Sequence, residues 1–257
     1  MHNLVCIGAG KLANHLMPAL EREGYDIVQV YSRTTANAQS LASKLHNASF
    51  ISDASLIHQG ADLYFFAIKD DAVEEVIRQT AYLENGKAIF VHTSGILPLE
   101  VIPFKRRGIF YPLQTFSAHH SVDWKKTPLL ITSDNKEIDS ALTSLAEKIS
   151  DLVYQVEDKD RAILHLGAVF ANNFTNHMLT LAEKICNEHQ VSFEILKPII
   201  RETIVKAMDV GPANSQTGPA IRGDQHTIEK HLQLLDGNTQ LQDLYRKITE
   251  SIIESSH

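Results

Sequence analysis

The most constraining feature of the sequence is a glycine-rich turn near its start, Gly8-Ala9-Gly10-Lys11-Leu12-Ala13. It follows an apolar run, Asn3–Gly8, that predicts a buried strand, and it opens a helical pattern over Lys11–Glu23. A G-x-G-x-x-A pattern between a strand and a helix is typical of dinucleotide-binding folds. The first glycine permits the tight turn, the second lets backbone approach a pyrophosphate, and the small third residue lets the helix pack closely. A tight turn without a ligand is the alternative interpretation.

Short apolar runs alternate with helical patterns over the first 156 residues. The predicted strands are Asn3–Gly8, Ile27–Tyr31, Ser49–Ile51, Leu63–Ile68, Ala88–His92, Gly108–Tyr111, Leu129–Thr132 and Leu152–Val156. The predicted helices between them are Lys11–Glu23, Thr35–Leu45, Asp71–Tyr82 and Lys136–Ser150. This alternation predicts an α/β fold with a doubly wound, mostly parallel Rossmann sheet.

The rest of the chain shows only helical periodicity. The predicted helices are Lys159–His189, Phe193–Val210, Gln225–Leu235 and Leu241–Ser255. We therefore expect two domains, a Rossmann domain over 1–156 and an all-helical domain over 157–257. Because no flexible linker separates them, we expect the long helix to pack directly on the sheet domain.

Composition excludes several classes of function. The 257 residues include 24 basic and 31 acidic side chains, a formal charge of −7, which argues against nucleic acid as a partner. No apolar run approaches the ~18 residues of a membrane span, and no secretory signal pattern is present. Cys6 and Cys186 give no disulfide framework and no metal-ligand spacing, so we expect no metal and two reduced core cysteines in a cytoplasmic protein.

The end of the second predicted strand selects the cofactor. It reads Tyr31-Ser32-Arg33-Thr34, without the Asp or Glu that NAD enzymes use to bind the ribose hydroxyls. Ser32 and Thr34 can donate hydrogen bonds to a 2′-phosphate, and Arg33 can pair with its charge. This segment favours NADP(H) over NAD(H), unless Arg33 is only a solvated loop residue.

Further loops follow the carboxyl ends of strands, where such sheets bind ligands. Ala67-Ile68-Lys69 and Thr93-Ser94 are expected to contact the cofactor, and Ser94 is also a candidate catalytic contact. We interpret His92 as a half-buried strand-end residue rather than a ligand. In a third loop, Gln114 is a candidate substrate contact or a turn residue.

The long helix carries other candidates. His165, Ala168, Asn172 and Asn176 recur at the spacing of one helix face. Polar groups on the face nearest the sheet are costly if buried without partners, so a cleft there explains them. We expect His165 or His177 to donate a proton, Asn172 to act in catalysis by orienting the substrate, and Asn176 to contact it. A structural histidine is the alternative for either imidazole.

A polar loop, Asn214–Asp224, lies between predicted helices. Its Arg222 can clamp a carboxylate or phosphate with two hydrogen bonds. We therefore include Arg222 among the substrate contacts. The alternative is a structured loop in which Arg222 pairs with Asp224.

The sequence resembles the Rossmann-like NADP oxidoreductases whose helical half is classed as domain of unknown function 2520. The matching segments span nearly the whole chain: Gly8–Ala13, Asp70-Asp71-Ala72, His92–Gly95, Pro112–Phe116, Ala168–Asn173, Thr217–Pro219 and Arg222–Asp224. The wider group includes pyrroline-5-carboxylate reductases, deazaflavin-dependent NADP reductases and 6-phosphogluconate dehydrogenase-like proteins. The resemblance implies NADP(H), a site between the domains, a small-molecule substrate and a homodimer through the helical domain.

Two positions depart from that wider group. Val169 stands where the β-hydroxyacid dehydrogenases have a lysine, and Tyr111 stands where relatives often have a histidine before proline. Without the lysine, imine reduction is easier to explain than alcohol and ketone chemistry. We expect an NADP(H)-dependent oxidoreductase; the alternatives are a non-catalytic NADP-binding sensor or docking module, and a domain that binds another nucleotide.

Overall fold

The computed structural model describes residues 2–118 and 120–255. Its contacts divide the chain into two compact units, Met1–Thr175 and Asn176–His257. The sequence places the domain boundary at residue 156, whereas contacts group the helical segment up to Thr175 with the sheet. Each unit is described by itself.

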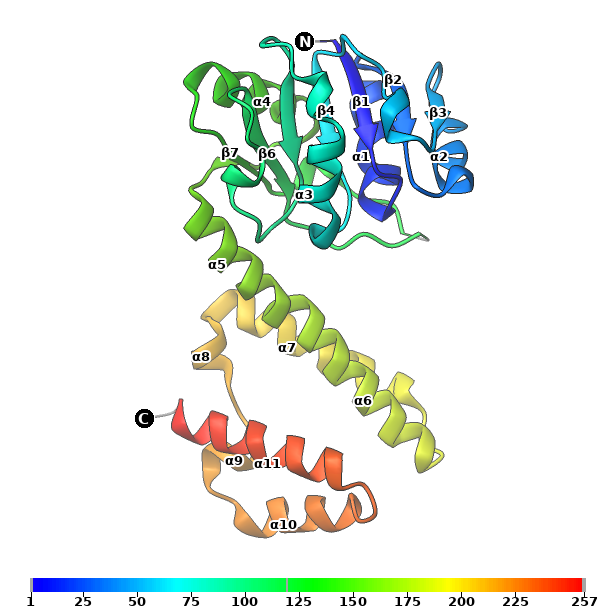
Figure 1. Cartoon of the computed structure of the whole chain (residues 1–257). Helices are drawn as coiled ribbons and strands as arrows, with labels where there is room; N and C mark the ends of the chain where they lie inside the picture. Colours follow the sequence, from blue (N-terminus) through cyan, green and yellow to red (C-terminus); the bar gives the residue numbers. More distant parts are fainter. Residues whose placement is uncertain (1, 119, 256–257) are drawn as a thin grey trace. The chain divides into compact units, whose positions relative to one another are not determined.

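The first unit is built on one eight-stranded sheet in the order β3-β2-β1-β4-β5-β6-β7-β8 (Figure 1). The strands are β1 (Asn3–Ile7), β2 (Asp26–Tyr31), β3 (Ser49–Ile51), β4 (Leu63–Phe66), β5 (Ile89–His92), β6 (Arg107–Pro112), β7 (Leu129–Thr132) and β8 (Val153–Gln155). Strands β1 to β6 are parallel, β7 is antiparallel to β6, and β8 is parallel to β7. The predicted mostly parallel sheet is confirmed, and the chain order reverses between β1 and β4, where doubly wound folds bind ligands.

Helices cover both faces of this sheet. They are α1 (Lys11–Arg22), α2 (Thr35–Ala42), α3 (Asp70–Gln79) and α4 (Lys136–Ile149), and α5 (Asp158–Ala168) follows β8 without joining either apolar cluster. Alternate strand residues point to opposite faces. Leu4 and Cys6 accordingly lie in one apolar cluster with α1, α2 and α4, whereas Val5 and Ile7 lie in a second cluster with α3.

The strand register explains how one tyrosine reaches beyond the sheet edge. Ile7, Phe66, His92 and Ile109 form one row of paired residues across β1, β4, β5 and β6. Strands β1, β4 and β5 end at this row, but β6 continues to Pro112. Tyr111 therefore stands two residues beyond the row, about 7 Å along the strand.

The long helix after β8 is not a regular α-helix. The sequence predicts a single helix over Lys159–His189, but α5 passes into a π-helical segment, Val169–Phe174, before α6 (Thr175–Glu188). A π segment closes i→i+5 hydrogen bonds and so adds a residue to the turn. Residues on either side of it no longer follow the single α-helical face that the sequence predicts.

The second unit is helical, as expected. It contains most of α6, then α7 (Lys197–Val210), α8 (Pro212–Ser215), α9 (Pro219–Arg222), α10 (Gln225–Leu234) and α11 (Thr239–Glu254). The predicted loop Asn214–Asp224 thus includes a one-turn helix, α9, and the end of α8. Among the described residues of this unit, only Ala220 and Ile228 are buried. Such a small core distinguishes it sharply from the sheet unit.

The two cysteines have different environments. Cys6 is buried in β1, its thiol donates to the Gly8 carbonyl, and burial raises the pKa of the thiol to about 12. Cys186 is only partly buried, so the prediction of a core position is wrong for this residue. Its helix lies in the unit that has almost no core of its own.

No helix in the described part of the chain is long and apolar enough to cross a lipid bilayer. Within residues 2–118 and 120–255, no group of three or more His, Cys, Asp or Glu side chains is arranged to hold a metal ion.

Candidate functional site

The turn between β1 and α1 depends on a glycine at position 8. Gly8 has φ +118°, a conformation that residues with a Cβ rarely adopt. A Cβ at this position would also lie 2.2 Å from the carbonyl oxygen of Ala67, in the loop after β4. Gly8 therefore lets the first two ligand loops of the sheet lie against each other.

The second glycine leaves the start of α1 open. Gly10 is the N-cap of α1 and offers no side chain to its free amides, and a Cβ built on it would meet nothing within 4 Å. Asn14 donates to the carbonyls of Ala9 (3.2 Å) and Gly10 (3.0 Å), which braces the loop. Free amides and a positive helix end facing open space form a cradle for a pyrophosphate, so the residues present fit a dinucleotide.

A pocket of about 500 Å³ surrounds this turn. Its lining is Gly8, Ala9, Gly10, Lys11, Leu12, Tyr31, Ser32, Arg33, Thr34, Asn37, Ala67, Ile68, Lys69, Ala72, Val76 and Thr93. We call it the glycine pocket. Three cations, Lys11, Arg33 and Lys69, line it, and its lining contains no carboxylate although the whole chain is acidic. Every predicted cofactor contact except Ser94 lies here.

The end of β2 shapes one side of the glycine pocket. The Ser32 hydroxyl accepts a hydrogen bond from the Thr34 amide (3.3 Å), and α2 begins at the next residue. Arg33 is exposed and forms no ion pair with another described residue. Asn37, which the sequence analysis missed, adds an amide from the first turn of α2. Hydroxyls, an unpaired guanidinium and a helix start can together bind a phosphate monoester.

A second pocket, of about 350 Å³, lies where β6 meets the long helix. Its lining is Tyr111, Leu113, Gln114, Thr115, His165, Ala168, Val169, Ala171, Asn172 and Asn173. We call it the tyrosine pocket. The predicted residues Gln114, His165 and Asn172 are brought together here. The lining contains no Asp, Glu, Lys or Arg.

Tyr111 and His165 form the closest polar contact of the tyrosine pocket. The Tyr111 hydroxyl lies 2.8 Å from His165 Nδ1, and the two rings meet edge to face. A Cβ on Gly95 would lie 2.5 Å from His165 Nδ1 and 2.8 Å from Tyr111 Cζ, so this glycine packs directly on the pair. Burial raises the pKa of Tyr111, with Asp70 adding to the rise and Arg161 opposing it.

The two pockets are neighbours in the first unit. Thr93 lines the glycine pocket, and Gly95, two residues later, packs on Tyr111 and His165. Two residues span at most ~7 Å of chain. A group bound at Thr93 is therefore within reach of a small molecule in the tyrosine pocket.

The loop between the pockets is held by buried polar groups. The buried His92 accepts the Ser94 amide hydrogen at Nδ1 (3.2 Å), which leaves Nε2–H to donate to the Pro98 carbonyl (3.3 Å). Burial, followed by the charge of Arg161, lowers the pKa of His92 to about 4. Ser94 is also buried, and its hydroxyl accepts from the amides of Ile96 and Leu97. Ser94 is absent from the lining of both pockets, so its catalytic role stays a prediction.

Arg161 was not singled out from the sequence, yet it ties this loop to α5. Its guanidinium is buried and pairs with Asp158, Thr132 and the Leu97 carbonyl. Asp158 in turn accepts from the Leu99 amide (2.9 Å). The only available signal was an arginine three residues after an aspartate in a helix, which is common on exposed surfaces.

The remaining candidates lie elsewhere. Asn176 and His177 are exposed on α6 and do not line either pocket. The π segment changes the helical phase between Asn172 and Asn176. Arg222 is the exposed last residue of α9 in the second unit, and no ion pair with Asp224 is found in the described part of the chain. Asp224 instead caps α10 by accepting from Thr227.

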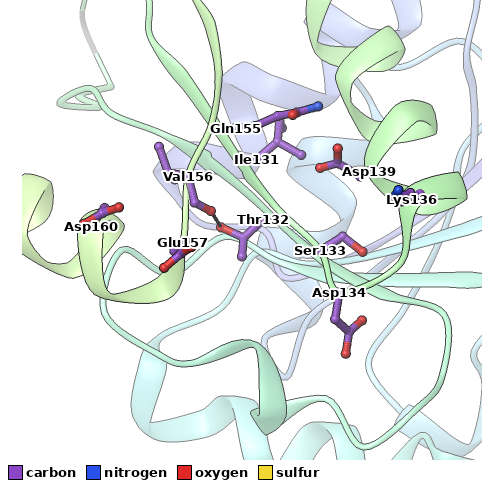
Figure 2. A pocket seen from close by; sticks show the side chains of 10 residues that line it. All are labelled: Ile131, Thr132, Ser133, Asp134, Lys136, Asp139, Gln155, Val156, Glu157 and Asp160. Atoms are coloured by element: carbon purple, nitrogen blue, oxygen red, sulfur yellow. Dashed lines mark hydrogen bonds between the residues drawn. The ribbon is translucent and has the colours of Figure 1, made fainter.

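A third pocket, of about 480 Å³, lies at the ends of β7 and β8 and the starts of α4 and α5 (Figure 2). Four carboxylates and one lysine line it: Asp134, Asp139, Glu157, Asp160 and Lys136. We call it the acidic pocket. Burial raises the pKa of Asp139. Nothing in the sequence analysis pointed to this pocket.

Two family models match parts of this chain. Residues 3–92 match the family model described as NADP oxidoreductase coenzyme F420-dependent, and residues 127–252 match the domain of unknown function DUF2520. No curated protein matches the chain.

Three solved structures are similar over nearly the whole chain. A "putative NADP oxidoreductase" from Bacteroides fragilis is 39% identical, with 98% of both chains covered and a TM-score of 0.92. A protein from Thermotoga maritima is 21% identical, with 98% of both chains covered and a TM-score of 0.72. An imine reductase from Myxococcus stipitatus in complex with NADP+ is 13% identical, covering 98% of this chain and 92% of that chain, with a TM-score of 0.67. The last two show a shared fold.

The predicted resemblance is thus confirmed by a close relative over the full length and by both family models. The chain belongs to the NADP oxidoreductase family that joins this Rossmann domain to a DUF2520 helical domain, and its cofactor is NADP(H).

Proposed function

We propose that this protein is an NADP(H)-dependent oxidoreductase that transfers a hydride between the nicotinamide and a small molecule in the tyrosine pocket. One observation carries the proposal. A cationic pocket built on Gly8 and Gly10 adjoins, through Thr93–Gly95, a smaller pocket that has polar groups but no formal charge. The first suits a phosphorylated dinucleotide, and the second suits the molecule that reacts with it.

Different residues of the glycine pocket bind different parts of the dinucleotide. The free amides at the start of α1 bind the pyrophosphate, with Lys11 nearby. Ser32, Arg33 and Thr34 bind the 2′-phosphate. Lys69 and Thr93 lie on the loops that lead to the nicotinamide. When bound, NADPH supplies the hydride, and the protein supplies orientation and electrostatics.

The tyrosine pocket holds the substrate. Gln114 and Asn172 offer amides that can donate to a carbonyl oxygen or accept from an amine. Asn176 and Arg222 remain proposed substrate contacts on the strength of the sequence. The imine reductase that shares this fold supports a C=N or C=O substrate, and Val169 in place of a lysine favours C=N.

We further propose a homodimer formed through the helical domain. Among the described residues of this unit only Ala220 and Ile228 are buried, too few to stabilise it by apolar burial within one chain. Ile204, Val205 and Met208 on α7 are 49%, 54% and 75% exposed and share one apolar helix face, which a second copy would cover. Light scattering should give twice the chain mass. Met208→Asp should shift the protein toward monomer, whereas Lys230→Asp, a charge change on another helix, should not; a monomeric wild-type protein would contradict the proposal.

We place the protein in the cytoplasm. Cys6 and Cys186 are both free thiols, as expected in a reducing compartment. Fractionation of the native host would test this placement, and recovery outside the cytoplasm would contradict it.

Calorimetric titration with NADPH and then NADH tests the proposed cofactor site. We expect NADPH to bind at micromolar Kd and NADH at least tenfold more weakly, a gap of about 1.4 kcal/mol. NADPH oxidation would then be followed with small ketones, imines and oxidised deazaflavin. Binding without oxidation of NADPH would indicate a cofactor-sensing module instead, and equal binding of both nucleotides would contradict the role given to the end of β2.

A further inference from the structure

We propose that Tyr111 is the proton donor for reduction in the tyrosine pocket and that His165 is the positioning residue that directs its proton. This inference rests on the proposed function, because it names the acid of the same site. The sequence alone predicts His165 or His177 as the proton donor, and in it Tyr111 stands out only as a departure from relatives.

Placement makes Tyr111 available to a substrate. Strand β6 carries it two residues past the row at which β1, β4 and β5 end. It lines the tyrosine pocket, and Gly95, two residues from the Thr93 contact of the glycine pocket, packs on its ring. The phenol thus lies between the substrate and the loop that leads to the nicotinamide.

The hydrogen bond to His165 leaves the phenol with the proton to give. A hydroxyl can accept one hydrogen bond and donate another. When His165 Nδ1–H donates to the Tyr111 oxygen across their 2.8 Å contact, the phenolic proton points away from the imidazole and toward the pocket. His165 Nδ1 is committed to Tyr111 and cannot also reach the substrate.

The other side chains that line the pocket are poorer acids. Gln114, Asn172 and Asn173 carry amides, Thr115 carries an alcohol, and the rest are apolar apart from the Tyr111–His165 pair. Val169 and Ala168 present only apolar groups to the pocket from the long helix. Tyr111 is therefore the strongest acid that the lining offers outside the imidazole it contacts.

The reaction balances with this donor. A hydride with its electron pair comes from NADPH and forms a C–H bond at the substrate carbon, while the C=O or C=N π pair takes the proton released as the Tyr111 O–H bond breaks. The products are an alcohol or amine, NADP+ and a tyrosinate. His165 Nδ1–H and the buried charge of Arg161 stabilise the tyrosinate until it takes a proton from water.

Neutral lining also defines the substrate class. No lysine or arginine lines the tyrosine pocket to neutralise a carboxylate or phosphate, and no carboxylate lines it to hold a cation. Moving a charged group out of water without a partner is costly. We therefore expect the part of the substrate that this pocket holds to be an uncharged ketone or imine group rather than a carboxylate or phosphate.

Kinetics of paired variants test the donor. Tyr111→Phe should lower kcat for the best uncharged ketone or imine by about 10²–10⁴-fold and leave the Kd for NADPH within twofold. Tyr154→Phe, at an exposed tyrosine on β8, is the matched control and should retain kcat. His165→Asn keeps an N–H donor near the Nδ1 position and should keep most of the activity, whereas His165→Leu should lose at least tenfold. If Tyr111→Phe keeps kcat within threefold, the assignment is wrong.

A second readout needs no substrate. Nitrogen NMR of histidine-labelled, NADPH-bound protein, with His165→Asn to identify the signal, reports whether His165 Nδ1 carries a proton at pH 7. A protonated Nδ1 supports the assignment, and a bare Nδ1 that accepts the phenolic proton overturns it. If wild type binds NADPH but oxidises it with no compound tested, the hydride-transfer proposal fails, and this NMR result still decides the state of the pair.

Discussion

The glycine pocket and the acidic pocket are almost equal in volume, at about 500 and 480 Å³, yet they are opposite in charge. Three cations and no carboxylate line the first, whereas four carboxylates and one lysine line the second. Each includes the start of a helix that follows a strand. Volume alone therefore does not distinguish the proposed dinucleotide site from another pocket of the same size.

The difference lies in how each helix begins. Two helices start at the acidic pocket: α4 is capped by Asn135, whose side chain accepts from the amides of Glu137 and Ile138, and α5 has no side-chain cap. Both carry acidic residues in the first turn. Helix α1 begins at Gly10 with no side-chain cap and no acid in its first turn. A helix start binds an external anion only where the protein has not already satisfied it.

The largest expected effect is on the Kd for NADPH, when a side chain is added in the turn between β1 and α1. Gly8→Ala should raise the Kd for NADPH more than a hundredfold and destabilise the fold, because the new Cβ meets the Ala67 carbonyl and φ is positive. Gly24→Ala is the matched control, since Gly24 has φ +88° with no atom in the way, and it should cost only about 1–2 kcal/mol. Calorimetry and urea unfolding measure both effects. Equal behaviour of the two variants would show that the close approach to Ala67 is unimportant.

The stability of the region between the glycine pocket and the acidic pocket should depend on pH, because His92 is buried there. Thr132 lines the acidic pocket and accepts from Arg161, whose charge also acts on the buried His92 beside the glycine pocket. A histidine pKa lowered from 6.5 to about 4 means that the unfolded chain binds the proton more readily. This contribution to stability is complete above pH 6.5 and falls by about 3 kcal/mol as the pH drops to 4.

Urea unfolding of the wild type and of His92→Asn at pH 7 and pH 4.5 measures how much the free energy of unfolding depends on the protonation of His92. The variant should be less stable at pH 7, because it loses buried contacts, but should lose less stability on acidification. Asp158, which raises the pKa of His92, and Arg161, which lowers it, stay in place in both proteins. Parallel pH profiles for the two proteins would show that His92 is not the group that titrates.

The smallest expected effects come from removing one charge from each pocket and measuring nucleotide affinity. Arg33→Ala should weaken NADPH binding about tenfold or more, about 1.4 kcal/mol, and leave NADH binding nearly unchanged. Asp160→Asn in the acidic pocket should change neither Kd by more than twofold. Calorimetry at one salt concentration compares the four affinities. If Arg33→Ala lost equal affinity for NADPH and NADH, Arg33 would not bind the 2′-phosphate.

Most of the fold was accessible from sequence because it is encoded over short distances. All eight strands lie within two residues of their predicted ends, since each is a compact apolar run bounded by turn residues. The antiparallel pairing of β7 was not foreseen. Its signal was the short connection from Leu113 to Pro128, whose described residues form only one 3-10 turn, Trp124–Lys126, in place of the helix that a parallel crossover usually has.

The candidate site was predictable only in part. Most residues of the glycine pocket belong to local turns at the ends of β1, β2 and β4 and were predicted from the sequence, although Asn37 was missed; their roles in binding stay a prediction. The Tyr111–His165 contact joins residues 54 positions apart, and the Arg161 network joins positions 64 apart. Such pairs depend on strand stagger and helix phase, which a single sequence does not reveal.

The π segment Val169–Phe174 has a consequence for how this helix can change length. A deletion of one residue within it would return the segment to ordinary α-helical pairing at little local cost, because the extra residue is what the wider turn accommodates. The segment would then reach Thr175 in nearly the same helical phase, because the deletion removes only the residue that the wider turn adds. A single codon can thus shorten this helix by one residue without turning the side chains that line the tyrosine pocket.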